Sequence, residues 1–160
     1  MAKAVALVSA ICILAFAATI AQCHKQQVFK IEGDVYCDPC RVQFQHDLSY
    51  KLAGAAVTLE CINLETKAVT YSVDGVTDSN GKYRLQVTGE HENDNCYVKV
   101  VKSPKPDCCE PLTDVSLSKV VVTGNIGIHS DVRYANPIGF MTKEPNPQCI
   151  SVLQDFFSDE

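Results

Sequence analysis

Apolar and polar residues alternate along most of the chain from Val28 onward. The alternation has a period of two residues, whereas an amphipathic helix repeats about every 3.6 residues. Because successive side chains of a β-strand point to opposite faces, this pattern predicts half-buried strands. In the first stretch, residues 28–37, the apolar face holds Phe29, Ile31, Val35 and Cys37, and the polar face holds Lys30, Glu32, Asp34 and Tyr36.

Further stretches alternate in the same way and predict four more strands, at residues 56–61, 69–73, 82–87 and 96–100. Two additional strands are expected within residues 118–124 and 131–141. The inward-facing side chains of the four alternating stretches are expected to be Val57, Leu59 and Cys61; Val69, Tyr71 and Val73; Tyr83, Leu85 and Val87; and Cys96, Val98 and Val100.

Turn-forming residues separate these stretches. The sequence TDSNG at residues 77–81 predicts a tight hairpin between the third and fourth strands, because Asp, Asn and Gly tolerate turn geometry. Proline-rich loops are expected at residues 102–111 and 144–149, and residues 42–52 fit either a short helix or a loop. Short strands joined by turns predict an all-β fold, a single antiparallel β-sandwich or barrel of about seven strands.

The N-terminal segment differs from the rest of the chain. A basic flank precedes an apolar run at residues 4–21 that contains no acidic residue, which predicts a cleaved secretory signal helix. A retained membrane anchor would need a longer run and a basic stop-transfer flank. Cleavage after Ala21 and cleavage after Cys23 both fit, and we favour the second. Residues 1–23 are then the signal peptide and residues 24–160 the mature β domain.

The charge of the chain limits its partners. The formal net charge is −5, and removal of the signal, which contains one lysine and no acid, brings it to −6. No basic run and no cluster of Lys or Arg with aromatic residues is present, so we expect neither nucleic acid nor an anionic membrane as a partner. These features together predict a small protein secreted to the extracellular space.

Cysteine is abundant in the chain. Such a density in a small secreted domain is typical of a disulfide framework. Seven or eight cysteines remain after signal cleavage, depending on the cut. The nine positions in the full chain are 12, 23, 37, 40, 61, 96, 108, 109 and 149.

The Cys37-x-x-Cys40 pair fits a redox centre, half of a zinc site, or two separate disulfide anchors. A thioredoxin-type centre begins a helix of an α/β unit, whereas a strand leads into Cys37. Cys108 and Cys109 are too close together to supply two tetrahedral zinc ligands, and Cys149 stands alone. We therefore expect no redox centre, no metal and no cofactor, and two cysteines that each anchor a distant part of the sheet.

The sequence GDVYCDPCR, residues 33–41, resembles the signature of the Ole e 1-like pollen protein family, including its tomato pollen-type members. Residues 75–83, 100–104 and 127–141 are similar to other stretches of that family, and the resemblance extends over residues 28–149. The residues that match the signature are Gly33, Val35, Tyr36, Cys37, Asp38, Cys40 and Arg41.

The resemblance implies a disulfide pattern in which the first of six cysteines pairs with the fifth, the second with the sixth and the third with the fourth. Cys109 has no counterpart in the six; it has a partner in Cys23 only if the signal is cut after Ala21. We expect a monomer, with a dimer linked through Cys109 as the alternative. Residues 63–66 miss the N-glycosylation sequon by one position. The implied pairs are Cys37–Cys108, Cys40–Cys149 and Cys61–Cys96.

Two other features invite a functional interpretation. Residues 90–96 gather His91, Glu92 and Asp94, but they lack the ordered alternation of a calcium loop, so a solvated acidic hairpin loop is favoured. Tyr36 is the one aromatic residue on the polar face of the first strand. We expect it to cover an edge of the sandwich rather than to contact a partner.

No catalytic constellation is apparent. His46 and His129 lie far apart in the sequence and no nucleophile motif accompanies them, and nothing around Asp114 or Asp131 indicates an acid–base pair. We therefore expect no enzyme.

The resemblance implies a secreted pollen-type protein that acts as a ligand or interaction module in pollen hydration and pollen tube growth. Its partner would be a cell-surface receptor ectodomain or a cell-wall component, and members of the family are frequent allergens. The alternative is a hydrolase or an inhibitor that acts on wall material, and a hydrolase requires paired acid and base groups in a cleft.

Overall fold

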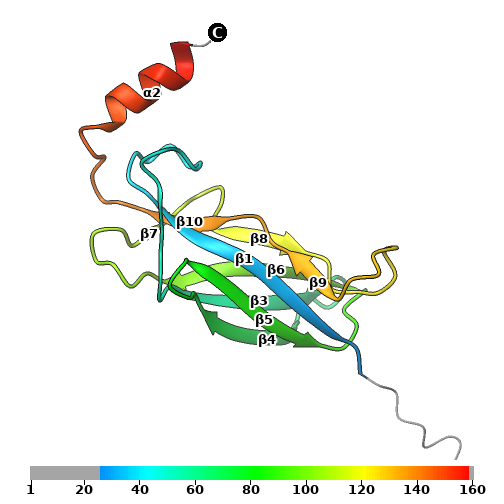
Figure 1. Cartoon of the computed structure of the whole chain (residues 1–160). Helices are drawn as coiled ribbons and strands as arrows, with labels where there is room; N and C mark the ends of the chain where they lie inside the picture. The colour runs from blue at the N-terminus through cyan, green and yellow to red at the C-terminus, as the bar shows by residue number, and fades with distance from the viewer. Residues whose placement is uncertain (1–25, 159–160) are drawn as a thin grey trace, which may run out of the picture.

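The computed structural model describes residues 26–158, so the expected signal segment lies outside the described residues. Two β-sheets form a sandwich, and helix α2 projects beyond one end of it (Figure 1). The predicted all-β sandwich is confirmed. The elements are β1 (Val28–Asp38), β2 (Tyr50–Lys51), β3 (Ala56–Asn63), β4 (Val69–Val76), β5 (Lys82–Thr88), β6 (Asp94–Lys102), β7 (Glu110–Pro111), β8 (Leu117–Val120), β9 (Val132–Tyr134), β10 (Ile138–Met141) and α2 (Cys149–Ser158).

The first sheet is organised around β1. The N-terminal half of this strand lies between β5, which is antiparallel to it, and β9, which is parallel. Its C-terminal half lies between antiparallel β2 and parallel β10, and β7 pairs with the far edge of β10. The single strand expected at residues 131–141 is therefore two short strands, interrupted near Pro137, which lacks the N–H needed to continue a ladder. The parallel pairing was not expected from the alternation.

The second sheet has the order β4-β3-β6-β8, and all its neighbours are antiparallel. An irregularity between Cys61 and Ile62 brings Tyr71 opposite Cys61 and Val69 opposite Ile62, so that Thr70 is skipped. Val69 is consequently 57% exposed, and the expectation that it faces the core is wrong. The extra residue of a β-bulge reverses the face of every side chain beyond it.

The core between the sheets contains most of the predicted inward-facing side chains. From β1, the side chains of Phe29, Ile31, Val35 and Cys37 are fully buried, as the alternation predicts. Tyr71, Val73 and Val100 pack against this core while remaining partly exposed. The other buried members from the predicted faces are Val57, Leu59, Cys61, Tyr83, Leu85, Val87, Cys96 and Val98.

Residues 77–81 form the predicted turn but not the predicted hairpin. Asp78 Oδ1 accepts hydrogen bonds from the backbone N–H groups of Asn80 at 2.8 Å and Lys82 at 3.0 Å, and Gly81 has a φ of +72°. The strands on either side belong to different sheets, because β4 pairs with β3 and β5 pairs with β1. The turn therefore carries the chain from one layer of the sandwich to the other.

Two segments near the end of β1 complete the fold. Residues 42–52 contain turns and the short strand β2, so the loop alternative holds there. Helix α2 was not predicted; Asn146 precedes it, and its side-chain Oδ1 accepts a hydrogen bond from the N–H of Gln148 at 2.9 Å. Among residues 26–158, no helix has the length and apolar character needed to cross a membrane.

Candidate functional site

The signature residues lie along the second half of β1 and in the turn that follows it. A Cβ on Gly33 would collide with the hydroxyl of Tyr83, which explains why this position has no side chain. The structure contains the disulfides Cys37–Cys108, Cys40–Cys149 and Cys61–Cys96, the three pairs that the family resemblance implies.

Asp38 organises the turn after β1. Its carboxylate is fully buried. Oδ1 accepts hydrogen bonds from the backbone N–H groups of Cys40 at 2.8 Å and Arg41 at 2.9 Å, and from Nε2 of His46 at 3.0 Å. Oδ2 accepts from the N–H of Gln43 at 2.7 Å. A buried carboxylate is tolerated only when such bonds replace its hydration, so Asp38 serves as a structural acceptor for this turn.

His46 is held in one tautomer by its surroundings. Nε2 donates to Asp38, and Nδ1 accepts a hydrogen bond from the N–H of Leu48 at 3.2 Å. This pattern assigns the proton to Nε2 and leaves no lone pair on the ring without a partner. The side chain is 3% exposed. A general base must accept a proton from a substrate, and His46 has neither the free nitrogen nor the access to do so.

Arg41 joins this turn to strand β7 and to the residue that follows β10. Its Nη1 donates to Oε2 of Glu110 at 2.7 Å and also to the carbonyl oxygen of Thr142. Arg41 and Gln43 adopt left-handed backbone conformations, with φ values of 59° and 66°. Non-glycine residues adopt this conformation when surrounding bonds hold it, and both donate their N–H to the Asp38 carboxylate.

Tyr36 does not lie on an exposed face. Its side chain is only 2% exposed, which excludes a direct partner contact through the ring and corrects the assignment of this position to a polar face. A Cβ on Gly139 would lie 3.2 Å from the Tyr36 ring and 3.1 Å from Leu112, so these two side chains cover β10 together. Burial, followed by the charges of Asp38 and Asp34, raises the pKa of Tyr36 to about 12.

A second His–Asp pair lies at the start of β6. His91 precedes the strand, and Asp94 is its first residue. Nδ1 of His91 lies 3.0 Å from Oδ2 of Asp94, which also accepts from the hydroxyl of Thr70 at 2.7 Å, while Asn63 donates to Oδ1 at 3.3 Å. Burial acts to raise the pKa of Asp94, but hydrogen bonds from these three side chains lower it below the usual value. The His91 and Asp94 side chains are 10% and 9% exposed, so the expectation of a solvated loop is wrong for both.

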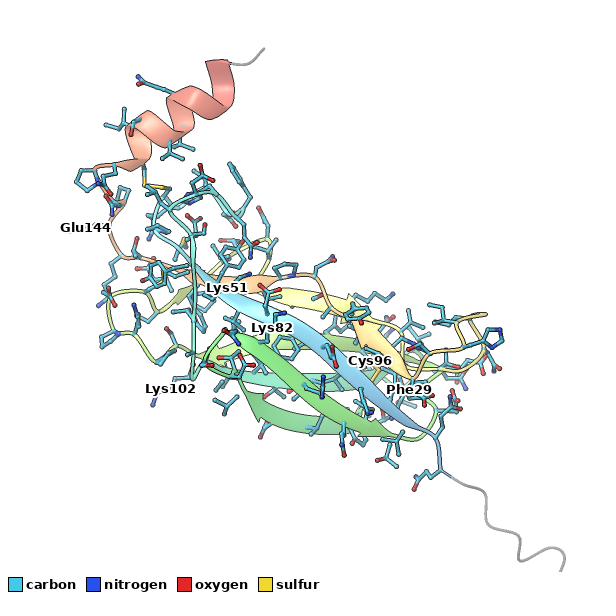
Figure 2. All side chains as sticks on the ribbon, viewed as in Figure 1. Phe29, Lys51, Lys82, Cys96, Lys102 and Glu144 are labelled. Carbon is cyan, nitrogen blue, oxygen red and sulfur yellow. A yellow bond between two sulfur atoms is a disulfide. The ribbon has the colours of Figure 1, made fainter. Side chains whose placement is uncertain are left out.

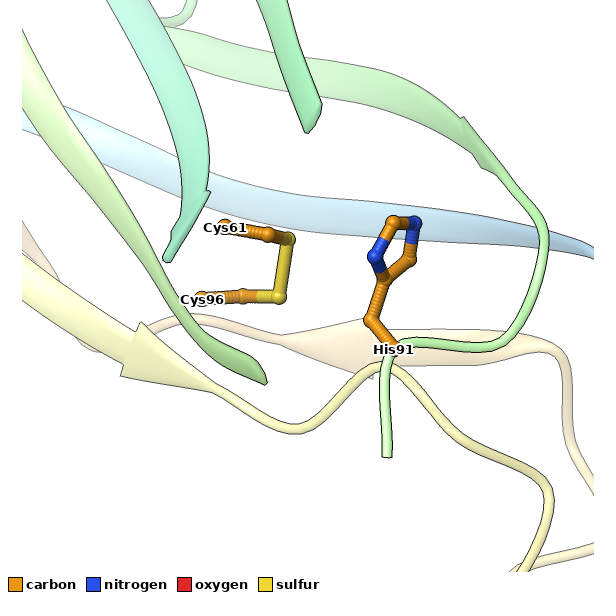
Figure 3. Close-up of side chains that lie close together, drawn as sticks. All are labelled: Cys61, His91 and Cys96. Atoms are coloured by element: carbon orange, nitrogen blue, oxygen red, sulfur yellow. A yellow bond between two sulfur atoms is a disulfide. The ribbon is translucent and has the colours of Figure 1, made fainter. Parts of the chain in front are cut away.

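The His91 imidazole lies beside the Cys61–Cys96 disulfide, as Figure 3 shows. One ring nitrogen and both sulfur atoms lie within 4.8 Å of one another, and Nε2 is buried without a hydrogen-bond partner among residues 26–158. Asp38, Cys40 and His46 form a second group of this kind. The sulfur atoms of both groups are held in disulfides, whereas metal binding by cysteine requires a thiolate. Neither group offers thiolate ligands in this state.

The remaining candidates lie apart from one another. Asp114 lies at the end of the molecule that carries the signature, because its N–H donates to the side chain of Gln43 at 2.9 Å. Asp131 accepts a hydrogen bond from the N–H of Lys30 on its backbone oxygen, near the opposite end of β1. His129 is exposed in the same loop as Asp131. Asp114 and Asp131 therefore lie near opposite ends of β1 and form no acid–base pair with each other.

Comparison with known proteins agrees with this geometry. The family model described as "Pollen protein Ole e 1 like" matches residues 27–157. The chain is 51% identical to anther-specific protein LAT52 of Solanum lycopersicum over 155 residues, which cover 97% of this chain and 95% of that protein. It is 43% identical to pollen allergen Che a 1 of Chenopodium album, covering 93% of this chain and 89% of the allergen.

A solved structure has the same fold. The crystal structure of the major plantain pollen allergen Pla l 1 superposes with a TM-score of 0.69 at 40% sequence identity, covering 76% of this chain and 99% of that one. The range matched by the family model, residues 27–157, includes the signature turn and all six paired cysteines. The chain belongs to the Ole e 1-like family of pollen proteins.

Proposed function

We propose that the mature protein acts outside the cell as a non-enzymatic ligand or interaction module in pollen hydration and pollen tube growth. Its partner is the ectodomain of a cell-surface receptor or a component of the cell wall. The names of the relatives above describe anther-specific and allergenic pollen proteins, and none of these names denotes an enzyme. Secretion is supported by the signal-like leader and by the three disulfides, which persist in oxidising compartments.

The observation that carries this function is the inaccessibility of both His–Asp pairs. His46 uses both ring nitrogens in internal hydrogen bonds, and the carboxylate of Asp38 is fully buried. His91 and Asp94 are about nine-tenths buried. A hydrolase needs an acid and a base that reach the substrate from the wall of a cleft, whereas a binding module needs only an exposed surface. The interaction role is therefore favoured over wall hydrolysis.

The test uses the oxidised mature chain, immobilised and incubated with membrane and wall fractions of pollen and pistil. Saturable capture of one receptor ectodomain or one wall polymer is expected, and it should be lost after reduction with dithiothreitol, because the disulfides hold the surface in shape. A parallel incubation with wall polysaccharides should release no new reducing ends. Release of new reducing ends in this incubation would establish the hydrolase instead.

A further inference from the structure

A cavity of about 490 Å³ lies over the sheet formed by β5, β1 and β9. Its position follows from strand register: Glu32 of β1 lies between Arg84 of β5 and Tyr134 of β9, and Asp34 lies opposite Lys82. Lys82 is labelled on this part of the molecule in Figure 2. The volume falls within the range in which proteins hold small ligands.

The charges around the cavity nearly balance. The carboxylates of Glu32, Asp34 and Asp78 line it together with the cations of Lys82 and Arg84. Nε of Arg84 donates to Oε1 of Glu32 at 2.7 Å, which leaves the rest of the guanidinium, on a side chain 66% exposed, available as a donor. A polyanion would meet three carboxylates here, and a polycation would meet two cations. A neutral ligand whose groups both donate and accept hydrogen bonds fits this mixture best.

Apolar contacts border the polar groups. Tyr134 of β9 is 78% exposed, and Val76 at the end of β4 is 64% exposed. An exposed tyrosine ring offers an apolar face with a polar tip. The C–H face of a sugar ring packs on such a surface, while its hydroxyl groups reach charged side chains at the edges.

Tyr83 borders the cavity from the core side of the sheet. It lines the cavity but is only 3% exposed, and its hydroxyl has no hydrogen-bond partner among the described residues. Burial, followed by the charge of Asp34, raises the pKa of Tyr83, so the hydroxyl remains a donor. Buried hydroxyl groups without partners are uncommon and unfavourable. Because the ring lies over Gly33 on the core face of the sheet, this hydroxyl belongs to the core, and the ligand contacts come from the outward-facing Glu32, Arg84 and Tyr134.

We propose that this cavity binds a neutral, hydroxyl-rich oligosaccharide of the type found in wall polymers. Tyr134 stacks on a sugar ring, Glu32 and Asp78 accept hydrogen bonds from sugar hydroxyls, and Arg84 and Lys82 donate to ring and hydroxyl oxygens. This site rests on the proposed function, of which it specifies the wall-component partner.

The test titrates the oxidised full chain with a neutral xyloglucan oligosaccharide, followed by heteronuclear NMR, with an oligogalacturonate as the anionic counterpart. The neutral probe should bind saturably and shift the amide signals of β1, β5 and β9. Tyr134→Ala should weaken binding at least tenfold, and Arg84→Ala about fivefold. Tyr97→Ala is the matched control, because Tyr97 lies on β6 in the other sheet, and it should leave binding unchanged.

The results separate this inference from the proposed function. Binding that is unaffected by both Tyr134→Ala and Arg84→Ala would overturn the site, as would stronger binding of the oligogalacturonate. Capture of a receptor ectodomain by a chain that binds neither sugar would also overturn the inference while the interaction role stands. Failure of both capture and sugar binding would remove the proposed function itself.

Discussion

Two groups of the same composition, each a histidine, an aspartate and a disulfide, lie in different parts of this molecule. At the signature turn, every polar atom of Asp38 and His46 takes part in a hydrogen bond. At the start of β6, Asp94 is also well bonded, but Nε2 of His91 is buried and has no partner in the part of the chain that the structure describes. The comparison teaches that residue types alone do not reveal a role, because the number of unused donors and acceptors differs between the two groups.

The two groups also differ in what they connect. The signature turn joins β1 to β7 and to the segment after β10 through Arg41, and to the start of α2 through Cys40–Cys149. The β6 group connects two strands that are already neighbours, since Cys61 and Cys96 lie opposite each other in the β3–β6 ladder. We therefore expect the signature turn to contribute more to stability.

The largest expected difference in stability between the signature turn and the β6 group comes from their disulfides. The Cys40–Cys149 bridge spans 109 residues and Cys61–Cys96 spans 35. In a chain-entropy estimate the first stabilises by at most about 4.8 kcal/mol and the second by at most about 3.8 kcal/mol. Paired Cys→Ser substitutions, followed by urea unfolding, should show the larger loss for the first bridge. Cys40→Ser alone should lose about as much as the double variant; an equal loss for both bridges would remove the distinction.

Asp38 and Asp94 provide the next comparison. Asp38→Asn places an amide N–H against backbone N–H donors in a buried site, and should lower the free energy of unfolding by about 3 to 5 kcal/mol. Asp94→Asn meets mainly side-chain partners that can rotate, and should lower it by about 1 to 2 kcal/mol. Urea unfolding of both variants measures the two losses. The reverse order would mean that the β6 group, and not the signature turn, holds the sandwich together.

Alkaline pH should lower the free energy of unfolding through Tyr36, in the signature half of β1. The pKa of Tyr36 is raised from 10.0 to about 12 in the folded protein. Its stabilising effect is therefore complete below pH 10 and is lost as the pH rises from 10 through 12, by about 2 to 3 kcal/mol in total. Unfolding measured over this range should show a shallower loss for Tyr36→Phe. An unchanged pH profile in that variant would assign the alkaline loss to other groups.

The two histidines should respond differently to the same substitution. His46→Gln leaves the N–H of Leu48 or the carboxylate of Asp38 without its partner and should destabilise by about 1 to 3 kcal/mol. His91→Gln keeps a donor for Asp94 and removes an acceptor that has no partner, so its effect should stay below about 1 kcal/mol. Equal losses in guanidinium unfolding would indicate that Nε2 of His91 has a partner in solution.

The smallest effect concerns the unpaired sulfur beside the signature framework. Cys109 is partly exposed and outside the three disulfides. Cys109→Ser should change the free energy of unfolding by less than about 0.5 kcal/mol. Any dimer seen in non-reducing electrophoresis should disappear in this variant. A large loss of stability would mean that Cys109 takes part in the folded core.

Most residues of the candidate site could be identified from the sequence pattern. Their hydrogen bonds and burial could not. The signature residues were recognised as a set, but the bond between Asp38 and His46 was not predicted, since it depends on the path of the loop between them. His91 and Asp94 were noted as neighbours, and their burial was not foreseen. The sequence gives little indication of this burial, because it depends on Asn63 of β3 and Thr70 of β4, which hydrogen-bond to Asp94.

The sequence by itself determined which side chains face inward at most strand positions, with Val69 and Tyr36 as exceptions, because alternation is a property of the extended backbone and requires no partner. It also determined the turn at Asp78 and Gly81, since that conformation is stabilised by local bonds. Only the tertiary structure decided that β4 and β5 enter different sheets, that β9 and β10 run parallel to β1, and that Tyr36 is buried. These features depend on which distant segment packs against a strand, and the period of its side chains carries no information about that neighbour.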